Sequence, residues 1–225
     1  MSSTESDPSE PEFIEETWDG QYDDPNAKIV LMSSDGVKVR LSAWNLKKKR
    51  AFVSDLHEVS NSGDTSAPIP LEAPQHVLRA FADLVSSSTA PYFKDLTTSD
   101  YDFLFQICDK MIAPTEHDKA IDSLATQVER FPWYSFVVAS KFKNVPLAKA
   151  ALSKMGGEGD SPATRLPNFA PGDLDEVRPS YILELIRCRL SPTMMYQEWD
   201  LPETEQQAYV FADWNDVAKK FSPSE

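Results

Sequence analysis

The side chains best suited to chemistry in this sequence are three histidines and two cysteines, and none of them belongs to a known catalytic motif. His57, His76 and His117 are too far apart along the chain for the spacings at which histidines usually share a zinc ion. HExxH is absent, as are the GxSxG motif of serine hydrolases and the phosphate-binding motifs GxxxxGKS/T and GxGxxG. We therefore expect no enzymatic activity, no metal ion and no cofactor.

The two cysteines differ in their sequence surroundings. Cys108 falls on the apolar face of a predicted helix, which is typical of a thiol packed in a core. Cys188 lies between Arg187 and Arg189, whose positive charges lower the pKa of a nearby thiol and raise its reactivity. With no CxxC pair, no signal peptide and no apolar run long enough to span a bilayer, we expect a cytoplasmic or nuclear protein without membrane contact.

Acidic residues outnumber basic ones, and they are concentrated at the N-terminus. The chain has 36 Asp and Glu against 22 Lys and Arg, a net charge of −14, which argues against a nucleic-acid partner. Residues 1–27 contain no Lys or Arg, and their Ser, Pro and acidic composition predicts a disordered acidic tail. Phe13, Ile14, Trp18 and Tyr22 stand among these acids, either as a docking motif or as isolated aromatic and aliphatic residues in a solubilising tail.

A basic run interrupts this acidic sequence at Lys47, Lys48, Lys49 and Arg50. One interpretation is that the run binds an acidic partner surface, or competes for the chain's own acidic tail. The other is that it is a solvated face of a helix, since a charge run of this length carries little information alone.

The strongest local signal predicts a β-hairpin. The apolar run Ile29–Met32 and the alternating run Val37–Leu41 flank Asp35 and Gly36, a pair that favours a type I′ turn. The continuous first run predicts a strand buried on both faces, and the alternating second run predicts a strand buried on one face. Residues 68–71 contain two prolines, which predicts a short strand at a sheet edge.

The rest of the chain is predicted to be helical. We expect helices over 43–59, 74–87, 101–112, 118–129, 132–153 with a break at Pro146, 177–190 and 203–221. Thr97 and Asp100 have the spacing of a capping box. The buried face of the helix that follows is predicted to comprise Phe103, Leu104, Ile107, Cys108 and Met111.

In this order, the elements resemble a BTB/POZ domain. The resemblance is carried by residues 28–36 with Val37, Val39 and Leu41, by residues 46–56, 69–71 and 108–110, and by residues 133–151, which resemble the helical extension of fungal BTB proteins. It implies an α+β fold with a BTB/POZ domain over 28–125, preceded by the tail 1–27 and followed by a helical C-terminal extension over 126–225.

The resemblance also implies a function, namely a non-catalytic protein–protein interaction module that acts as an adaptor for a cullin-type ubiquitin ligase. The alternative is a stand-alone oligomerisation or regulatory module with no role in ubiquitin transfer. The implied partners are proteins: a cullin, another BTB protein, or a second copy of the chain in a homodimer.

Two further sets of residues are candidates for partner binding. Phe93-Lys94-Asp95 is similar to the hydrophobic-x-Glu motif that cullin adaptors carry in the corresponding loop, although it is also a common loop tripeptide. Trp214 belongs to an apolar face with Val210, Val217 and Phe221. That face either clasps a partner, as the last helix of small BTB-fold adaptors does, or docks on the chain's own helices.

Overall fold

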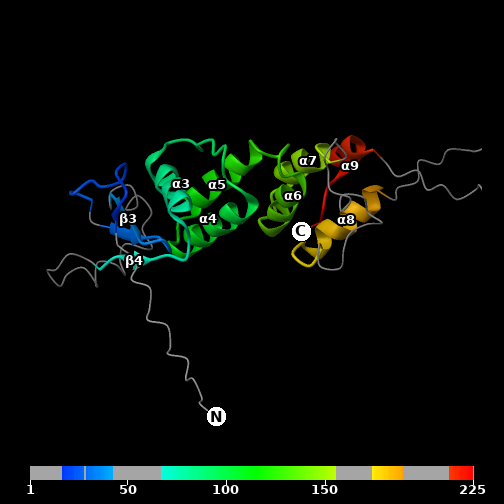
Figure 1. Ribbon diagram of the computed structural model, residues 1–225. Helices are drawn as coiled ribbons and strands as arrows, with labels where there is room; N and C mark the ends of the chain where they lie inside the picture. Colours follow the sequence, from blue (N-terminus) through cyan, green and yellow to red (C-terminus); the bar gives the residue numbers. More distant parts are fainter. Residues whose placement is uncertain (1–16, 28, 43–66, 156–173, 190–212, 225) are drawn as a thin grey trace, which may run out of the picture. The chain divides into compact units, whose positions relative to one another are not determined.

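The computed structural model describes residues 17–27, 29–42, 67–155, 174–189 and 213–224, which are the residues considered below (Figure 1). They form four strands and seven helices and thus belong to the predicted α+β class. The chain divides into two compact units, Met1–Ile121 and Asp122–Glu225. Among the helices of these described segments, none has both the length and the apolar composition required to cross a bilayer.

The first unit contains a small mixed sheet. Its strands are β1 (Thr17–Trp18), β2 (Ile29–Met32), β3 (Val37–Leu41) and β4 (Ile69–Pro70), in the spatial order β1-β3-β2-β4. β2 and β3 form the predicted antiparallel hairpin, whereas β1 pairs with β3 and β4 pairs with β2 in parallel. The proline-containing strand β4 lies at an edge, as predicted, where a missing N–H group costs no ladder hydrogen bond.

The hairpin turn is of a different type from the one predicted. A type I′ turn requires positive φ at both central residues, yet among the described turn residues only Gly36 has one, at 80°. The Gly36 amide donates to the Ser33 carbonyl oxygen at 3.1 Å, and the Ser33 amide donates to the Val37 carbonyl oxygen at 2.9 Å. This is a three-residue loop with glycine in the left-handed position, and the Ser33 hydroxyl, which accepts from the Val37 amide at 2.9 Å, completes it.

The sheet has one buried face and one partly exposed face. The buried side chains are those of Ile29, Leu31, Val37, Val39 and Leu41. The prediction that the first strand is buried on both faces is wrong, because Val30 and Met32 are only half-buried. They lie beside Lys38 and Arg40 on the second face, since Val30 pairs with Arg40 and Met32 with Lys38.

The prediction of disorder for the whole of residues 1–27 is also wrong for its last part. Residues 17–27 run along the hairpin, and Trp18 in β1 pairs with Lys38 in β3. The Asp19 amide donates to the Lys38 carbonyl oxygen at 2.9 Å, and the Arg40 amide donates to the Tyr22 carbonyl oxygen at 2.8 Å. The structured part of the first unit therefore begins before Lys28.

The described part of the first unit also contains α3 (Gln75–Ser86), α4 (Thr98–Lys110) and most of α5 (Pro114–Ala125), whose last residues belong to the second unit. α3 packs against β3 and α4. The five apolar residues that recur at helical spacing along α3 are all buried: Val77, Leu78, Phe81, Leu84 and Val85. On α4 the buried aromatic residues are Tyr101 and Phe105, whereas Phe103, which was predicted to be buried, is half-exposed.

Both ends of α3 are capped by residues from other elements. Pro74 at the N-cap supplies no side-chain acceptor, and the carboxylate of Asp35 in the hairpin accepts from the Gln75 amide at 3.1 Å. At the other end, the Lys119 ammonium of α5 donates to the carbonyl oxygens of Leu84 and Ser87 at 2.6 and 2.5 Å. These contacts place an anion at the N-terminus and a cation at the C-terminus, which is the favourable arrangement for the helix dipole.

The described part of the second unit is helical. It contains α6 (Pro132–Lys141), α7 (Val145–Ser153), α8 (Pro179–Arg189) and α9 (Trp214–Lys220). The predicted break in the stretch 132–153 lies before Pro146, between Lys141 and Val145. Pro146 stands in the first turn of α7, where its missing N–H group has no helical partner to lose, and the Asn144 side chain caps α7 by accepting from the Leu147 amide at 2.9 Å.

Two predicted helices fall wholly or partly outside the described residues. The helix over 43–59 lies outside them entirely, and of the helix over 203–221 only residues from 213 onward are described.

The capping box that opens α4 gives a first prediction. The Asp100 amide donates to Thr97 Oγ1 at 3.3 Å, and the Asp100 carboxylate accepts from the Thr97 amide at 2.8 Å. We expect Thr97→Ala to lower the free energy of unfolding by about 1 kcal/mol. Urea denaturation checks this, with Ser99→Ala, an exposed hydroxyl in the same turn, as the control that should change little. Equal losses in the two variants would contradict the role of the box.

Candidate functional site

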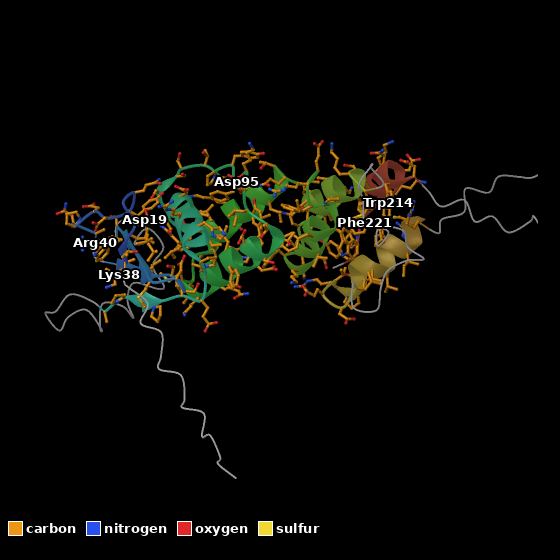
Figure 2. All side chains as sticks on the ribbon, in the orientation of Figure 1. Asp19, Lys38, Arg40, Asp95, Trp214 and Phe221 are labelled. Atoms are coloured by element: carbon orange, nitrogen blue, oxygen red, sulfur yellow. The ribbon has the colours of Figure 1, made fainter. Side chains whose placement is uncertain are left out.

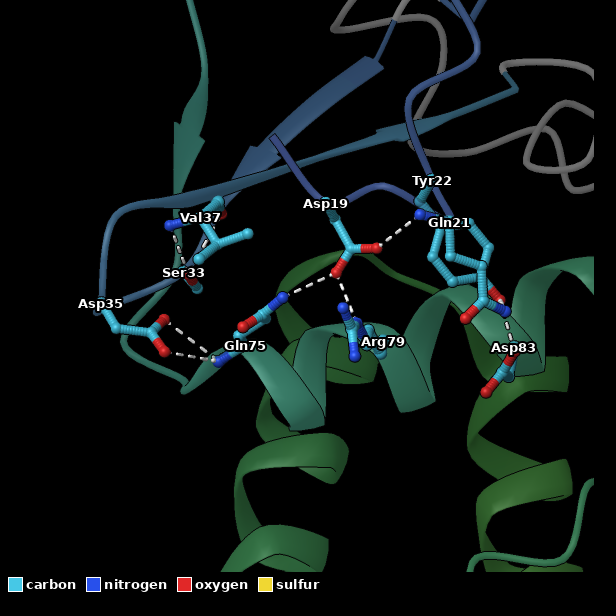
Figure 3. A network of polar contacts seen from close by, with 9 residues as sticks. All are labelled: Asp19, Gln21, Tyr22, Ser33, Asp35, Val37, Gln75, Arg79 and Asp83. Carbon is cyan, nitrogen blue, oxygen red and sulfur yellow. Dashed lines mark hydrogen bonds and ion pairs between the residues drawn. The ribbon is translucent and has the colours of Figure 1, made fainter. Parts of the chain in front are cut away.

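A buried carboxylate fixes the N-terminal segment to α3. The Asp19 side chain is 0% exposed and accepts three hydrogen bonds (Figure 3): from Gln75 Nε2 at 2.9 Å, from Arg79 Nε at 2.5 Å and from the Gln21 amide at 3.0 Å. Burial opposes ionisation of Asp19, but these hydrogen bonds and the Arg79 charge outweigh it and hold the pKa below its ordinary value. Asp19 is therefore a carboxylate whose charge is satisfied within the fold.

Further polar contacts extend this attachment along the segment. The Tyr22 hydroxyl donates to the Asp83 carboxylate of α3, and Asp23 forms an ion pair with Arg40 of β3 at 3.0 Å. Burial of the Tyr22 ring, with the adjacent Asp83 carboxylate, raises the pKa of the phenol above its ordinary value. As a result, the acidic segment 17–27 contacts both the sheet and α3, and its carboxylates are partners of residues within the first unit.

This attachment places Trp18 on the partly exposed face of the sheet. The Trp18 side chain is 41% exposed, the Arg40 guanidinium lies 3.9 Å from its ring centroid and the Lys38 ammonium lies 5.6 Å from it (Figure 2 labels both cations). We call Trp18, Lys38 and Arg40, with the half-buried Val30 and Met32, the Trp18 face. It combines an aromatic surface, aliphatic surface and positive charge, a composition typical of residues that contribute most to protein–protein binding.

A second exposed aromatic residue lies in the loop between α3 and α4. The predicted anchor Phe93 is 9% exposed, so its side chain faces the interior, whereas Asp95 is exposed. Tyr92, which lies outside the predicted tripeptide, is 64% exposed. The apolar group that this loop presents to solvent is therefore Tyr92, one residue before the predicted one.

A small groove lies at the other edge of the sheet. It has a volume of about 170 Å³ and lies between residues 71–73, which directly follow β4, and α4; its lining includes Leu71, Ile107, the half-exposed Phe103 and Lys110. The Lys110 ammonium donates to the Pro70 carbonyl oxygen at 3.1 Å. A groove of this size holds about one side chain, which is too little surface for a binding site by itself.

The remaining predicted contact residues lie elsewhere. Trp214 is 7% exposed and packs within the second unit, with the Arg189 guanidinium 4.0 Å from its ring centroid. Residues 47–50, the basic run, lie outside the described residues.

The structure also places the residues that were considered for chemistry. His76 contacts the Asp100 carboxylate at 2.8 Å, and the ring of His117 packs 5.0 Å from that of Phe105. Burial and the nearby Glu184 carboxylate raise the pKa of Cys188 despite the adjacent arginines, so a reactive thiolate is not favoured there. Within the described segments, no three His, Cys, Asp or Glu side chains are placed to hold a metal ion.

The chain matches no protein-family model, no curated protein and no solved structure among those with which it was compared.

The buried carboxylate gives a second prediction. Because the pKa of Asp19 is lowered on folding, its contribution to stability is complete above its ordinary pKa of 3.8 and is lost as the pH falls through the lowered value. We expect Asp19→Asn to cost about 1.5–3 kcal/mol at pH 7 and progressively less below pH 3.8. Denaturant titrations from pH 2.5 to 7 measure this difference between variant and parent.

The control for this comparison is Asp95→Asn, which removes an exposed carboxylate from the same unit. Because this carboxylate is exposed, its removal should change the free energy of unfolding little at pH 7. A difference between Asp19→Asn and the parent that stays constant with pH would contradict the assignment, because a neutral Asp19 cannot contribute through its charge.

Proposed function

We propose that the chain is a non-catalytic protein–protein interaction module of the BTB/POZ type and that the Trp18 face is its contact surface. The observation that carries this proposal is the half-exposed Trp18 ring held against two cations on a sheet whose other face is buried. Tryptophan and arginine are the residue types most enriched at binding hot spots.

The attachment of the Trp18 face favours this role over that of an incidental exposed ring. Trp18 lies next to Asp19, which three hydrogen bonds fix, and Arg40 is held between the Trp18 ring and Asp23. Side chains that are already ordered lose little conformational entropy when a partner binds. The charge of Lys38 and Arg40 complements an acidic partner segment, and the tryptophan complements an apolar or aromatic side chain within it.

The order of elements supports the family assignment. Among the described residues, a hairpin, a short edge strand and then helices follow one another over residues 29–125, in the order that the resemblance to BTB/POZ domains implies; the helix expected between the hairpin and the edge strand lies outside the described residues. β2 pairs with β3 in antiparallel and with β4 in parallel orientation, and the Trp18 face lies on this mixed sheet.

The adaptor role is a second proposal, and the loop between α3 and α4 is the observation that favours it. Tyr92 and Asp95 are both exposed there, so the loop offers an aromatic ring and a carboxylate to a cullin, with Phe93 anchoring the loop from beneath. The alternative is a stand-alone oligomerisation or regulatory module that uses the Trp18 face and not this loop.

Affinity capture from cells of the source organism tests the contact surface. We expect the partners of the full-length chain other than a cullin to be recovered at least tenfold less by Trp18→Ala, because truncating a tryptophan hot spot costs 2 kcal/mol or more, roughly 30-fold in affinity. Leu183→Ala, which removes an apolar side chain that is 68% exposed in the second unit, is the matched control. The same proteins recovered at equal yield by all three chains would contradict the assignment.

The adaptor proposal has its own test. A purified cullin should bind the full-length chain and lose at least tenfold in affinity for Tyr92→Ala/Asp95→Ala, since the pair supplies both the apolar contact and the charge. Trp18→Ala should leave this affinity unchanged. Absence of cullin binding, together with a light-scattering mass above that of one chain, would instead favour the oligomerisation module.

A further inference from the structure

The Trp18 face is joined directly to a segment of the chain that lies outside the described residues. Strand β1, which carries Trp18, follows residues 1–16 without a break. The Trp18 ring is 41% exposed, and the Arg40 guanidinium and the Lys38 ammonium lie 3.9 and 5.6 Å from its centroid. An accessible surface is thus covalently tethered to a stretch of sequence whose composition can be compared with it.

The charge of this stretch is opposite to that of the two cations on the Trp18 face. Residues 5–16 contain no Lys or Arg. Asp23 contacts Arg40 through Nη1 at 3.0 Å, and a guanidinium has further N–H donors with which it can bind a second carboxylate. The acidic residues of the stretch are Glu5, Asp7, Glu10, Glu12, Glu15 and Glu16.

The same stretch has apolar groups that match the aromatic and aliphatic part of the face. Residues 12–15 read Glu-Phe-Ile-Glu, so two apolar side chains stand between two carboxylates. Residues 8–11 have the PxxP spacing of peptides that bind aromatic surfaces. Trp18 and the half-buried Val30 and Met32 are the surface that such groups can cover.

The other long segment of the first unit outside the described residues does not match the face in charge. It comprises residues 43–66 and contains the basic run 47–50. Lys38 and Arg40 repel a run of like charge. Between these two segments, charge complementarity therefore selects the one that precedes β1.

The connection is long enough for the acidic stretch to reach the face. The chain enters β1 beside the hairpin turn, where the Thr17 amide donates to the Gly36 carbonyl oxygen at 3.1 Å. Phe13 is five residues before Trp18, and five extended residues span at most about 17 Å. A ligand on so short a tether has an effective concentration on the order of millimolar, so contacts that are weak between separate molecules suffice within the chain.

We infer that the Trp18 face binds acidic segments with an apolar or aromatic anchor, and that residues 7–16 of this chain occupy it in cis. Partner binding at this face rests on the proposed function, and the cis contact names its chemistry. A partner presents a segment of the same kind and displaces residues 7–16 to reach Trp18. Occupation in cis lowers the affinity of every such partner by the same factor, which is the effective concentration divided by the dissociation constant of the free segment.

The test compares the full chain with a neutralised chain, Glu10→Gln/Glu12→Gln/Glu15→Gln/Glu16→Gln. Fluorescence anisotropy measures how tightly each chain binds a labelled peptide of residues 5–16. We expect a dissociation constant on the order of 0.1 mM for the neutralised chain. The parent should bind the peptide about tenfold more weakly, because its own segment competes at a millimolar effective concentration.

Further substitutions in the neutralised chain identify the surface that the peptide occupies. Trp18→Ala should weaken binding at least tenfold and Lys38→Gln about threefold, whereas glutamines at all of residues 47–50 should change it about twofold or less. A Phe13→Ala peptide should bind about tenfold more weakly, and a Ser9→Ala peptide of the same charge should bind as the parent peptide does. Urea unfolding checks that each chain is folded, and Lys38→Gln decides the outcome if Trp18→Ala is not.

Two results would overturn the inference. Equal affinity of the parent and the neutralised chain for the peptide, or no binding by either, would show that residues 7–16 do not occupy the face. Loss of binding with glutamines at residues 47–50, but not with Trp18→Ala or Lys38→Gln, would assign the acidic stretch to the basic run instead. Either result leaves the affinity-capture test of Trp18 as a contact surface unaffected, because that test compares whole partners and does not use this peptide.

Discussion

The first unit depends on one buried carboxylate. Asp19 accepts from Gln75 and Arg79 of α3 and thereby joins the start of the chain to a helix about 60 residues further on. A buried charge is costly unless every lone pair is satisfied, so the position of Asp19 requires α3 to present both donors at once. The same helix depends on the hairpin in return, because Asp35 supplies the N-cap acceptor that Pro74 lacks.

This mutual dependence explains why an acidic segment is structured at all. Residues 17–27 bury little apolar surface, and their composition alone predicts disorder. Their carboxylates and the Tyr22 hydroxyl find partners on α3 and β3 instead, with Asp23 on Arg40 and Tyr22 on Asp83. The segment in turn holds Trp18 beside Lys38 and Arg40, so the polar contacts on one side of the strand create the aromatic and basic surface on the other.

The second unit attaches its last segment by a different physical means. Here the main contacts are apolar and aromatic, between Phe221 and the rings of Phe136 and Tyr181, and the charged residues Glu184 and Arg189 act at the ends. The two terminal described segments are thus each bound to the unit that contains them, one by hydrogen-bonded charges and the other by aromatic packing. Trp18 in the N-terminal segment is half-exposed, whereas Trp214 in the C-terminal segment is buried.

The sequence by itself determined the elements whose signals are local. The hairpin around Gly36, the edge strand with its prolines, the buried face of α3 and the capping box of Thr97 and Asp100 each depend on residues within a few positions of one another. Only the tertiary structure decided that Trp18 joins a sheet, that Phe93 turns inward while Tyr92 faces solvent, and that Trp214 is buried. These outcomes rest on partners far along the chain, and a two-residue strand or a single aromatic side chain has no periodic pattern from which its partner can be inferred.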